Sequence, residues 1–333
     1  MHSAMIGLGT CLPSRLVTNA ELAEGLDTSD EWIVSRTGIR SRYWVEPGTA
    51  TSDLAVEAGL RALKSAGLAP EDIDVVALAT TTPDHPCPAT APDVASRLGL
   101  GPVAAYDIAA VCSGFLYALA MGHAQIVAGQ ARTVLVIGAD AYSTILNPDD
   151  RATRVIFGDG AGAVVLTASD VPGRPGTVLG AHLGSDGAHK DLIRIPAGGS
   201  RQPVTADTAS ADRYFVMEGT KVFRQAVRHM SESATTLLGR IGWQTGEIDH
   251  LVGHQANARI LGALAGHLDI PVERAVVDID RVGNTSAASI PLALAHAAGQ
   301  GRFTRGDRVL MTAFGGGLTW ASAAITWPDI TPL

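Results

Sequence analysis

The sequence predicts an α/β protein made of two duplicated α/β halves, residues 1–170 and 171–333. The first observation is that short apolar runs, typical of buried strands, alternate with longer stretches of helical period. The second is that a set of elements occurs twice along the chain in the same order. Apolar residues make up 46% of the 333 residues and charged residues 17%, which is enough for a large core and excludes a disordered chain.

The predicted strands and helices alternate along the chain. Apolar runs predict strands at Val75–Thr80, Thr133–Gly138, Ala161–Thr167, His250–Gly253, Arg308–Ala313 and Ala321–Thr326. Helical periodicity predicts helices at Leu54–Ala66, Ala89–Leu98, Gly114–Ala128, Val222–Leu238 and Ala256–Leu268. Because the strands are almost continuously apolar, we expect mostly buried sheets covered by helices.

The repeat places two loop-to-helix junctions in equivalent positions. Tyr106–Ile108 precedes Cys112 and a helix, and Val277–Ile279 precedes Asn284 and a helix. Each of these helices is followed by an apolar strand. If the halves pack about a pseudo-twofold axis, the two junctions meet at the centre and build one site. Chance similarity between alanine-rich helices is the alternative explanation.

The charge balance and the cysteines exclude several classes of protein. A net charge of −8 argues against nucleic acid as a partner, because phosphate binding needs a basic surface. The first ten residues lack the charged start of a signal peptide, and no stretch approaches the roughly 18 apolar residues of a membrane span. Three widely spaced cysteines do not form a disulfide framework. We therefore expect a cytoplasmic enzyme with free thiols and no membrane contact.

Cys112 is the candidate nucleophile. It lies between a predicted strand and a predicted helix that begins near Ser113–Gly114. The free N–H groups and the positive dipole end of a helix N-terminus favour the thiolate, which is the reactive form of cysteine. A small buried cysteine that only fills space is the structural alternative.

Three further motifs have both ordinary and functional explanations. His254 follows a predicted strand at a loop, where polar residues are common and where function also concentrates. Asn284 precedes a helix, where it could simply be an N-cap. Gly315–Gly317 could form a tight turn or bring backbone N–H groups close to a ligand.

Taken together, these motifs resemble the 3-ketoacyl-acyl carrier protein synthase III family, which has the thiolase fold with its αβαβα layers. The resemblance extends over nearly the whole chain, from Gly7 to Trp320. Its motifs are Ser29–Ile33, Arg36–Ile39, Phe157–Gly162, His254–Asn257, Gly283–Ser289 and Phe314–Gly317, with Cys112 at the matching distance upstream.

The resemblance implies an acyltransferase that uses an acyl-Cys112 intermediate. Acyl-CoA would acylate Cys112, and malonyl-acyl carrier protein would then lose carbon dioxide while His254 and Asn284 bind its thioester carbonyl. The N–H groups of Cys112 and Gly316 would form the oxyanion hole, and Phe314 would pack beside the site. No metal and no other cofactor is implied.

The same resemblance implies the binding residues for both substrates. The expected CoA contacts are Thr28, Trp32, Arg36, Thr37 and Arg151. Met217 and Phe223 would line the pantetheine tunnel. Arg259, assisted by Arg224, would contact the acidic acyl carrier protein. These arginines would have to form a local basic patch that overcomes the net charge of −8 of this chain.

Cys87 departs from the family pattern. The resemblance implies a homodimer in which a residue of this loop closes the acyl pocket of the partner, and family members restricted to acetyl groups tend to have a large aromatic there. Cysteine is smaller, so we expect branched or medium-length acyl groups to be accepted.

Several alternatives stay open from the sequence. The primer, the carrier protein and the role of the polar segment 198–213 are undetermined, and so is the choice between primary fatty acid synthesis and starter priming in a polyketide or secondary pathway. Acyl transfer without condensation is disfavoured because His254 and Asn284 are both present. Hydroxymethylglutaryl-CoA synthase chemistry is disfavoured because no catalytic glutamate matches.

Overall fold

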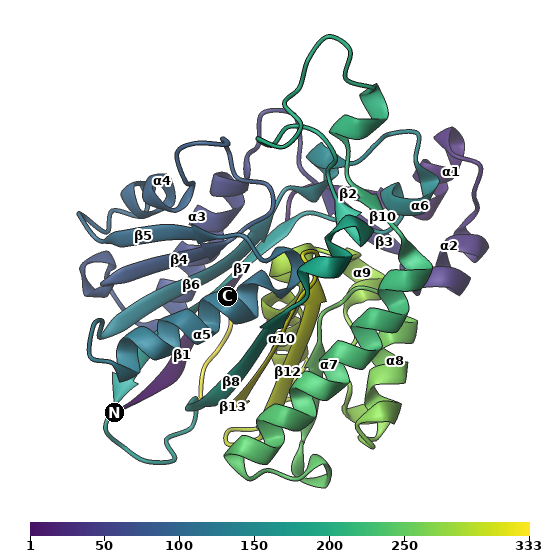
Figure 1. Cartoon of the computed structure of the whole chain (residues 1–333). Coiled ribbons are helices and arrows are strands. Elements are labelled where there is room, and N and C mark those ends of the chain that lie inside the picture. The colour runs from purple at the N-terminus through teal and green to yellow at the C-terminus, as the bar shows by residue number, and fades with distance from the viewer.

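Two sheets form the framework of the molecule, and helices cover and separate them (Figure 1). The computed structural model describes all 333 residues. The five-stranded sheet has the order β1-β7-β6-β4-β5, and the four-stranded sheet has the order β11-β12-β13-β8. Two small two-stranded sheets, β2-β3 and β9-β10, lie outside them.

The bounds of the elements are as follows. The strands are β1 His2–Cys11, β2 Arg15–Thr18, β3 Ser41–Trp44, β4 Val75–Ala79, β5 Ala104–Ile108, β6 Thr133–Asp140, β7 Gly160–Ser169, β8 Val178–Ser185, β9 Ile193–Arg194, β10 Val216–Met217, β11 His250–Gly253, β12 Arg308–Gly315 and β13 Thr319–Thr326. The α-helices are α1 Asn19–Gly25, α2 Asp30–Thr37, α3 Thr51–Ala66, α4 Ala91–Arg97, α5 Gly114–Val127, α6 Arg151–Arg154, α7 Gly219–Ile241, α8 Ala258–His267, α9 Ile279–Val282 and α10 Ser289–Gly299. None of these helices combines the length and the apolar character that a membrane crossing requires.

All six predicted strands and five predicted helices are present, with ends shifted by a few residues. The strands β1 and β8 were not predicted. Gly7 and Gly9 in β1, and Gly180 and Gly184 in β8, dilute the apolar pattern that marks a strand. The absence of a side chain is required at Gly9, where a Cβ would lie 2.2 Å from the Ala62 backbone nitrogen.

The two large sheets have the same strand order, with β8, β13, β12 and β11 in the places of β1, β7, β6 and β4. A single parallel bridge between Leu251 and Ala275 stands in the place of the β4–β5 pairing. The segment Val277–Ile279, which the repeat matches to the end of β5, forms no strand. The backbone N–H groups of Asp278 and Ile279 donate to the Gln255 side chain instead. The boundary between halves at residue 170 stays a prediction.

Two short 3-10 turns pack against each other where the halves meet. The turn η2 (Val111–Ser113) leads into α5, and the turn η8 (Ser286–Ala288) leads into α10. Val111 and Ser286, the first residues of these turns, have φ angles of 47° and 49°. By this backbone match, the counterpart of Cys112 is Ala287, and Asn284 lies three residues earlier.

The close packing of α3 on β1 generates a prediction about stability. A Cβ added at Gly9 would meet the backbone of α3, so Gly9→Ala should lower the free energy of unfolding by about 1–3 kcal/mol through overpacking. The control is Gly239→Ala, an exposed helical site where an added Cβ meets nothing within 4 Å. It should raise the free energy of unfolding by about 0.5–1 kcal/mol. Equal stabilities of the two variants in denaturant unfolding would contradict this packing.

Candidate active site

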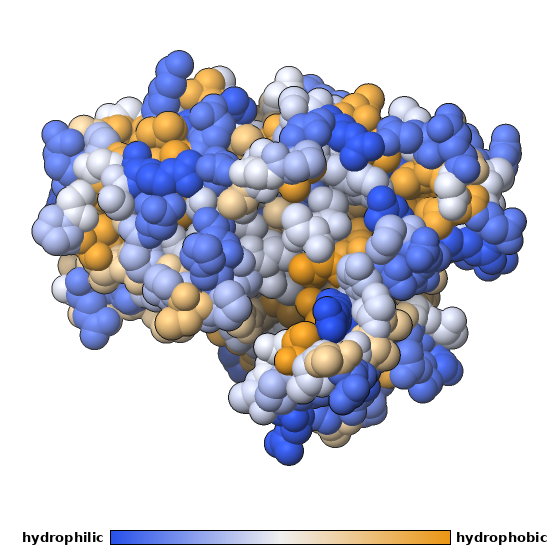
Figure 2. Space-filling view, turned by 90° about the horizontal axis from the view of Figure 1, so that it is seen from above, coloured by the Kyte–Doolittle hydropathy of each residue, from blue (hydrophilic) through white to orange (hydrophobic).

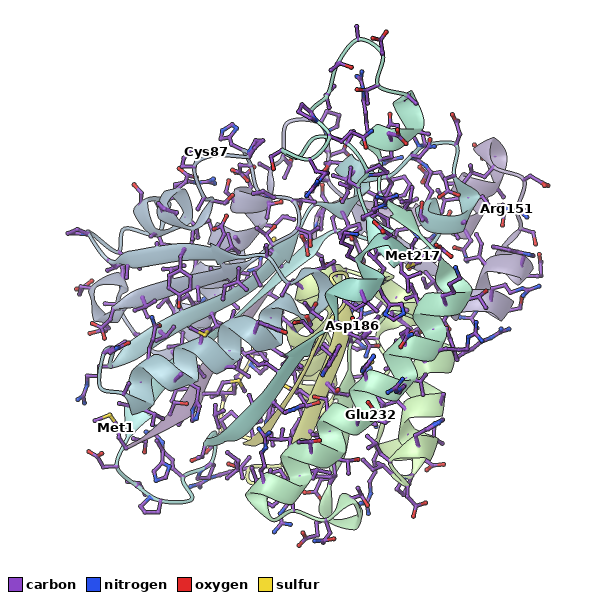
Figure 3. The ribbon with its side chains drawn as sticks, in the orientation of Figure 1. Met1, Cys87, Arg151, Asp186, Met217 and Glu232 are labelled. Carbon is purple, nitrogen blue, oxygen red and sulfur yellow. The ribbon has the colours of Figure 1, made fainter.

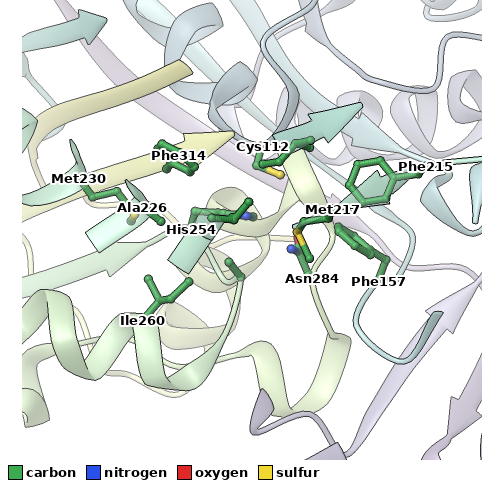
Figure 4. A pocket seen from close by; sticks show the side chains of 13 residues that line it. Cys112, Phe157, Phe215, Met217, Ala226, Met230, His254, Ile260, Asn284 and Phe314 are labelled. Carbon is green, nitrogen blue, oxygen red and sulfur yellow. The ribbon is translucent and has the colours of Figure 1, made fainter. Parts of the chain in front are cut away.

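Cys112, His254 and Asn284 line one small cavity at the centre of the molecule, with their side chains directed toward it (Figure 4). The cavity has a volume of about 30 Å³, and most of its wall is apolar. Its other lining residues are Phe157, Ile193, Phe215, Met217, Val222, Ala226, Met230, Ala256, Ile260 and Phe314. Three residues separated by up to 172 positions in the chain (112 to 284) therefore share one chamber.

Burial dominates the chemistry of Cys112. The side chain lies in η2 at the entry to α5, as predicted, but burial raises the pKa of its thiol to about 12. The Ser286 hydroxyl and the backbone N–H of Cys112 itself lower the pKa, and the Asp140 carboxylate raises it further. Burial therefore acts against the thiolate that the helix N-terminus is expected to favour, and the preference for the thiolate stays a prediction.

His254 is held as a neutral ring. Burial lowers its pKa to about 3, so the imidazole is uncharged at physiological pH. Its Nδ1 lies 2.6 Å from Ser289 Oγ, which also accepts from the Gln255 backbone N–H at 3.4 Å. These two hydrogen bonds can form together only if the Ser289 hydroxyl donates to Nδ1. The proton of the neutral imidazole ring then lies on Nε2. His254 then presents a hydrogen-bond donor from Nε2.

Asn284 is oriented by its own turn. Its Oδ1 accepts from the backbone N–H of Ser286 at 2.9 Å, so the side chain is engaged as a local cap, as the sequence pattern suggests. Its backbone pairs with Ile156 and Gly158 of the N-terminal half at 2.9 and 3.0 Å. Because Oδ1 is occupied, Nδ2 is the end of the amide that is left to donate.

The glycine run after Phe314 lies against the nucleophile. A Cβ at Gly315 would lie 2.8 Å from the Cys112 backbone nitrogen, and a Cβ at Gly316 would crowd Ile193 and Val111. The side chain of Phe314 lines the cavity. Only glycine at position 315 permits this approach of two backbones.

A larger cleft of about 550 Å³ opens from the cavity, and Met217, Val222 and Asn284 line both spaces. It brings together most of the residues that the resemblance assigns to substrate binding: Trp32, Arg36, Thr37, Met217, Phe223, Arg224 and Arg259. On the face seen from above, apolar atoms gather near the middle of a largely hydrophilic surface (Figure 2).

Two of the predicted binding residues, Arg151 and Thr28, do not line this cleft. Arg151 lies over the Trp32 ring at 5.0 Å but lines a neighbouring polar cleft, and Thr28 lines neither space of the site. Arg259 donates from its guanidinium to the backbone carbonyl of Ser35 at the end of α2. Arg224 is exposed and lines the cleft.

Cys87 is exposed and does not line the cavity of its own chain. Figure 3 places it on a loop well away from Met217 and Arg151. A role in the acyl pocket of the same chain is therefore excluded by its position.

Sequence reasoning missed four buried polar residues around the site. Ser289 and Gln255 fix the loop of His254, and Ser286 and Asp140 lie beside Cys112. Gln255, Ser286 and Ser289 fall within the family motifs, but only the tertiary contacts show what each of them does.

The exposure of Cys87 and the raised pKa of buried Cys112 predict an order of alkylation. With iodoacetamide at pH 8, exposed Cys87 should react first, and Cys112 should react at least about tenfold more slowly, because the reactive thiolate of a buried thiol with a pKa near 12 is scarce. Peptide mass spectrometry over time measures the order. Faster labelling of Cys112 than of Cys87 would show that local activation outweighs burial.

Comparison with known proteins agrees with this geometry. Residues 106–187 match the model of 3-oxoacyl-[acyl-carrier-protein] synthase III, and residues 238–327 match the model of its C-terminal part. The chain is 64% identical over 330 residues to beta-ketoacyl-[acyl-carrier-protein] synthase III 5 of Streptomyces coelicolor, covering 99% of this chain and 98% of that protein. It is 50% identical to the synthase III of Pseudomonas aeruginosa strain LESB58, over 99% of this chain and 98% of that protein.

Two solved structures give the same result. The crystal structure of 3-oxoacyl-(acyl carrier protein) synthase III from Pseudomonas aeruginosa PAO1 superimposes with a TM-score of 0.93 at 49% identity, over 100% of both chains. The priming β-ketosynthase of the R1128 polyketide pathway superimposes with a TM-score of 0.92 at 34% identity, over 98% of this chain and 97% of that chain. The predicted thiolase fold is confirmed, and the chain belongs to the 3-oxoacyl-[acyl-carrier-protein] synthase III family of condensing acyltransferases.

Proposed function

We propose that this synthase III condenses an acyl-CoA primer with malonyl-acyl carrier protein through an acyl-Cys112 intermediate, and so initiates fatty acid synthesis. The observation that supports this most directly is the pair of neutral donors, His254 Nε2 and Asn284 Nδ2, in one apolar chamber with a buried thiol. Two neutral donors stabilise an oxyanion that forms during a reaction and bring no charge of their own.

In the first half-reaction, the sulfur of Cys112 attacks the thioester carbonyl of acyl-CoA. A bond forms between Sγ and the acyl carbon, and the bond to the CoA sulfur breaks. The backbone N–H groups of Cys112 and Gly316 bind the oxyanion of the tetrahedral intermediate. The close approach of Gly315 to the Cys112 backbone supports this assignment.

In the second half-reaction, malonyl-acyl carrier protein occupies the same chamber. His254 and Asn284 donate to its thioester carbonyl while carbon dioxide leaves, and the enolate carbon attacks the acyl-Cys112 carbonyl. The apolar wall around Phe314 favours loss of the charged carboxylate as neutral carbon dioxide. These steps use side chains and backbone N–H groups only, and we propose that no metal or other cofactor takes part.

The outer cleft holds the substrate arms. Trp32 and Arg36 bind the adenine end of CoA together with Arg151, which lies against the Trp32 ring. Met217 and Phe223 flank the passage to Cys112, which suits a narrow pantetheine arm. Arg224 is the better candidate for contact with acyl carrier protein, because Arg259 is held by Ser35.

Priming of a polyketide pathway is the second candidate function. The likeness to the R1128 priming β-ketosynthase, at 34% identity, favours it specifically. Both functions share the residues described above and differ in the primer and the carrier protein.

We also propose a homodimer in the cytoplasm. The edge strand β5 leaves one side of the five-stranded sheet without a partner, and such an edge can pair with a second copy of the chain. A partner would bring its own Cys87, which is exposed in a single chain, within reach of the acyl site. The three free cysteines suit a reducing compartment.

Substitutions should separate the two half-reactions. His254→Ala and Asn284→Ala should each keep acylation of Cys112 by acyl-CoA but lower condensation about 10²–10³-fold, because each removes one oxyanion donor. Cys112→Ala should keep decarboxylation of malonyl-acyl carrier protein but form no acyl-enzyme. Intact mass spectrometry of both proteins follows every step.

The control is His267→Ala, an exposed histidine at the end of α8 that should leave both half-reactions unchanged. Wild-type condensation by His254→Ala would contradict the donor role. An acylated wild-type enzyme that never yields a 3-ketoacyl carrier protein would rule out condensation itself.

The size of residue 87 should set the primer range. Wild-type enzyme should accept branched or medium-length acyl-CoA, and Cys87→Phe should lower kcat/KM for hexanoyl-CoA at least about tenfold while acetyl-CoA is retained. Cys87→Ser, which preserves size, is the matched control. The idea fails if only acetyl-CoA acylates the wild-type enzyme.

A further inference from the structure

A buried arginine lies behind the two helices that hold the adenine end of CoA in the proposed function. Arg42 in β3 is fully buried, so it cannot touch a ligand in the cleft. Its Nη2 donates to the backbone carbonyl of Val155 at 2.7 Å, and its Nη1 donates to Asn19 Oδ1 at 2.7 Å. Val155 is the C-cap of α6 and lines the cleft. Arg42 is thus bonded directly to the end of the helix that carries Arg151.

Asn19 continues the connection to α2. Its Nδ2 donates to the carboxylate of Asp30, the first residue of α2, and to the carbonyl of Ile39, two residues beyond the end of that helix, both at 2.8 Å. Asn19 is only 1% exposed, so little water competes for these hydrogen bonds. One amide group therefore holds both ends of the helix that places Trp32 and Arg36 in the cleft.

Apolar packing beneath these helices is limited. The elements α1, α2 and α6 lie together at one end of the molecule, beside β2 and β3 (Figure 1). The apolar cluster there has seven buried residues, whereas the two largest cores of the molecule have 30 and 25. The Asn257 side chain holds the carbonyl end of α2 from the C-terminal half, through Arg36. We therefore expect the start of α2, where Trp32 lies, to depend most on the polar connection.

The charge of Arg42 strengthens this connection. Burial lowers the pKa of its guanidinium to about 10, so the group keeps its proton at physiological pH, and the nearby charge of Asp30 favours the protonated form. A charged donor makes stronger hydrogen bonds to Val155 and Asn19 than a neutral one would. A lysine could not replace it, because a single ammonium lacks the fork of the guanidinium.

We propose that Arg42 and Asn19 are positioning residues for CoA, which fix α2 and α6 at the spacing that the adenine nucleotide needs. This role rests on the proposed use of acyl-CoA as a substrate. The Arg151 guanidinium carbon lies 5.0 Å from the centroid of the Trp32 ring, and a shift of either helix would change that distance. Nucleotide binding would then weaken, while the chemistry at Cys112 would continue.

The test presents one acyl group on two thiols, CoA and N-acetylcysteamine, which is a pantetheine fragment without the nucleotide. Intact mass spectrometry measures the rate of Cys112 acylation at increasing concentrations of each thioester. Asn19→Ala should raise the half-saturating concentration of acyl-CoA about tenfold and keep the maximal rate, because only binding is weakened. The same variant should react with the N-acetylcysteamine thioester at the wild-type rate.

Two further variants guard against a misfolded protein. Asp30→Ala removes the exposed end of the connection, where a loss of folding is least expected, and Arg42→Met replaces the guanidinium by an apolar chain. Both should show the same selective loss with acyl-CoA. The double variant Asn19→Ala/Arg42→Met should be no worse than its weaker-binding single variant, because both residues act through one connection. Additive losses would contradict a shared connection.

The matched control is Ser233→Ala, which removes another buried polar contact, from the Ser233 hydroxyl in α7 to His182 Nδ1 at 3.0 Å. It should leave the reactions of both thioesters unchanged. Equal losses with the two thioesters in Asn19→Ala and Asp30→Ala, or no loss with acyl-CoA, would overturn the positioning role. So would a wild-type enzyme that binds both thioesters equally well, because the nucleotide would then contribute nothing. If neither thioester acylates Cys112 of the wild-type enzyme, the proposed function itself is wrong, and the positioning role with it.

Discussion

The turns η2 and η8 pack backbone against backbone at the centre of the molecule, and the position of each reacting group depends on that contact. Gly138 in β6 lets η8 approach the sheet, because a Cβ there would lie 2.4 Å from the Ala287 carbonyl oxygen. Gly315 plays the same part on the other side, against the Cys112 backbone nitrogen. Side chains at these points would separate the two halves and pull Cys112 away from Asn284.

Burying this contact removes water from the site, and desolvation then changes each titratable group in its own direction. Burial disfavours the charged form, so it raises the pKa of Cys112 to about 12 and of Asp140 to about 6, and it lowers the pKa of His254 to about 3. A neutral histidine suits a hydrogen-bond donor. The same burial disfavours ionisation of the Cys112 thiol.

The outer cleft differs from the inner chamber in its exposure to solvent and in its charged side chains. Its arginines and its tryptophan are partly exposed, so solvent weakens the electrostatic contacts between them. Arg151 already covers the Trp32 ring, so an adenine bound there as proposed would have to displace or join it.

The sequence by itself determined the order of strands and helices and the family motifs, because periodicity and turn residues are local properties. It named Cys112, His254 and Asn284, which the fold brings into one cavity. The tertiary structure alone decided which atoms of these residues remain free, since Ser289 and Ser286 occupy His254 Nδ1 and Asn284 Oδ1. It also decided the high pKa of Cys112 and the place of Asp140, because burial is the sum of contacts from segments far apart in the chain.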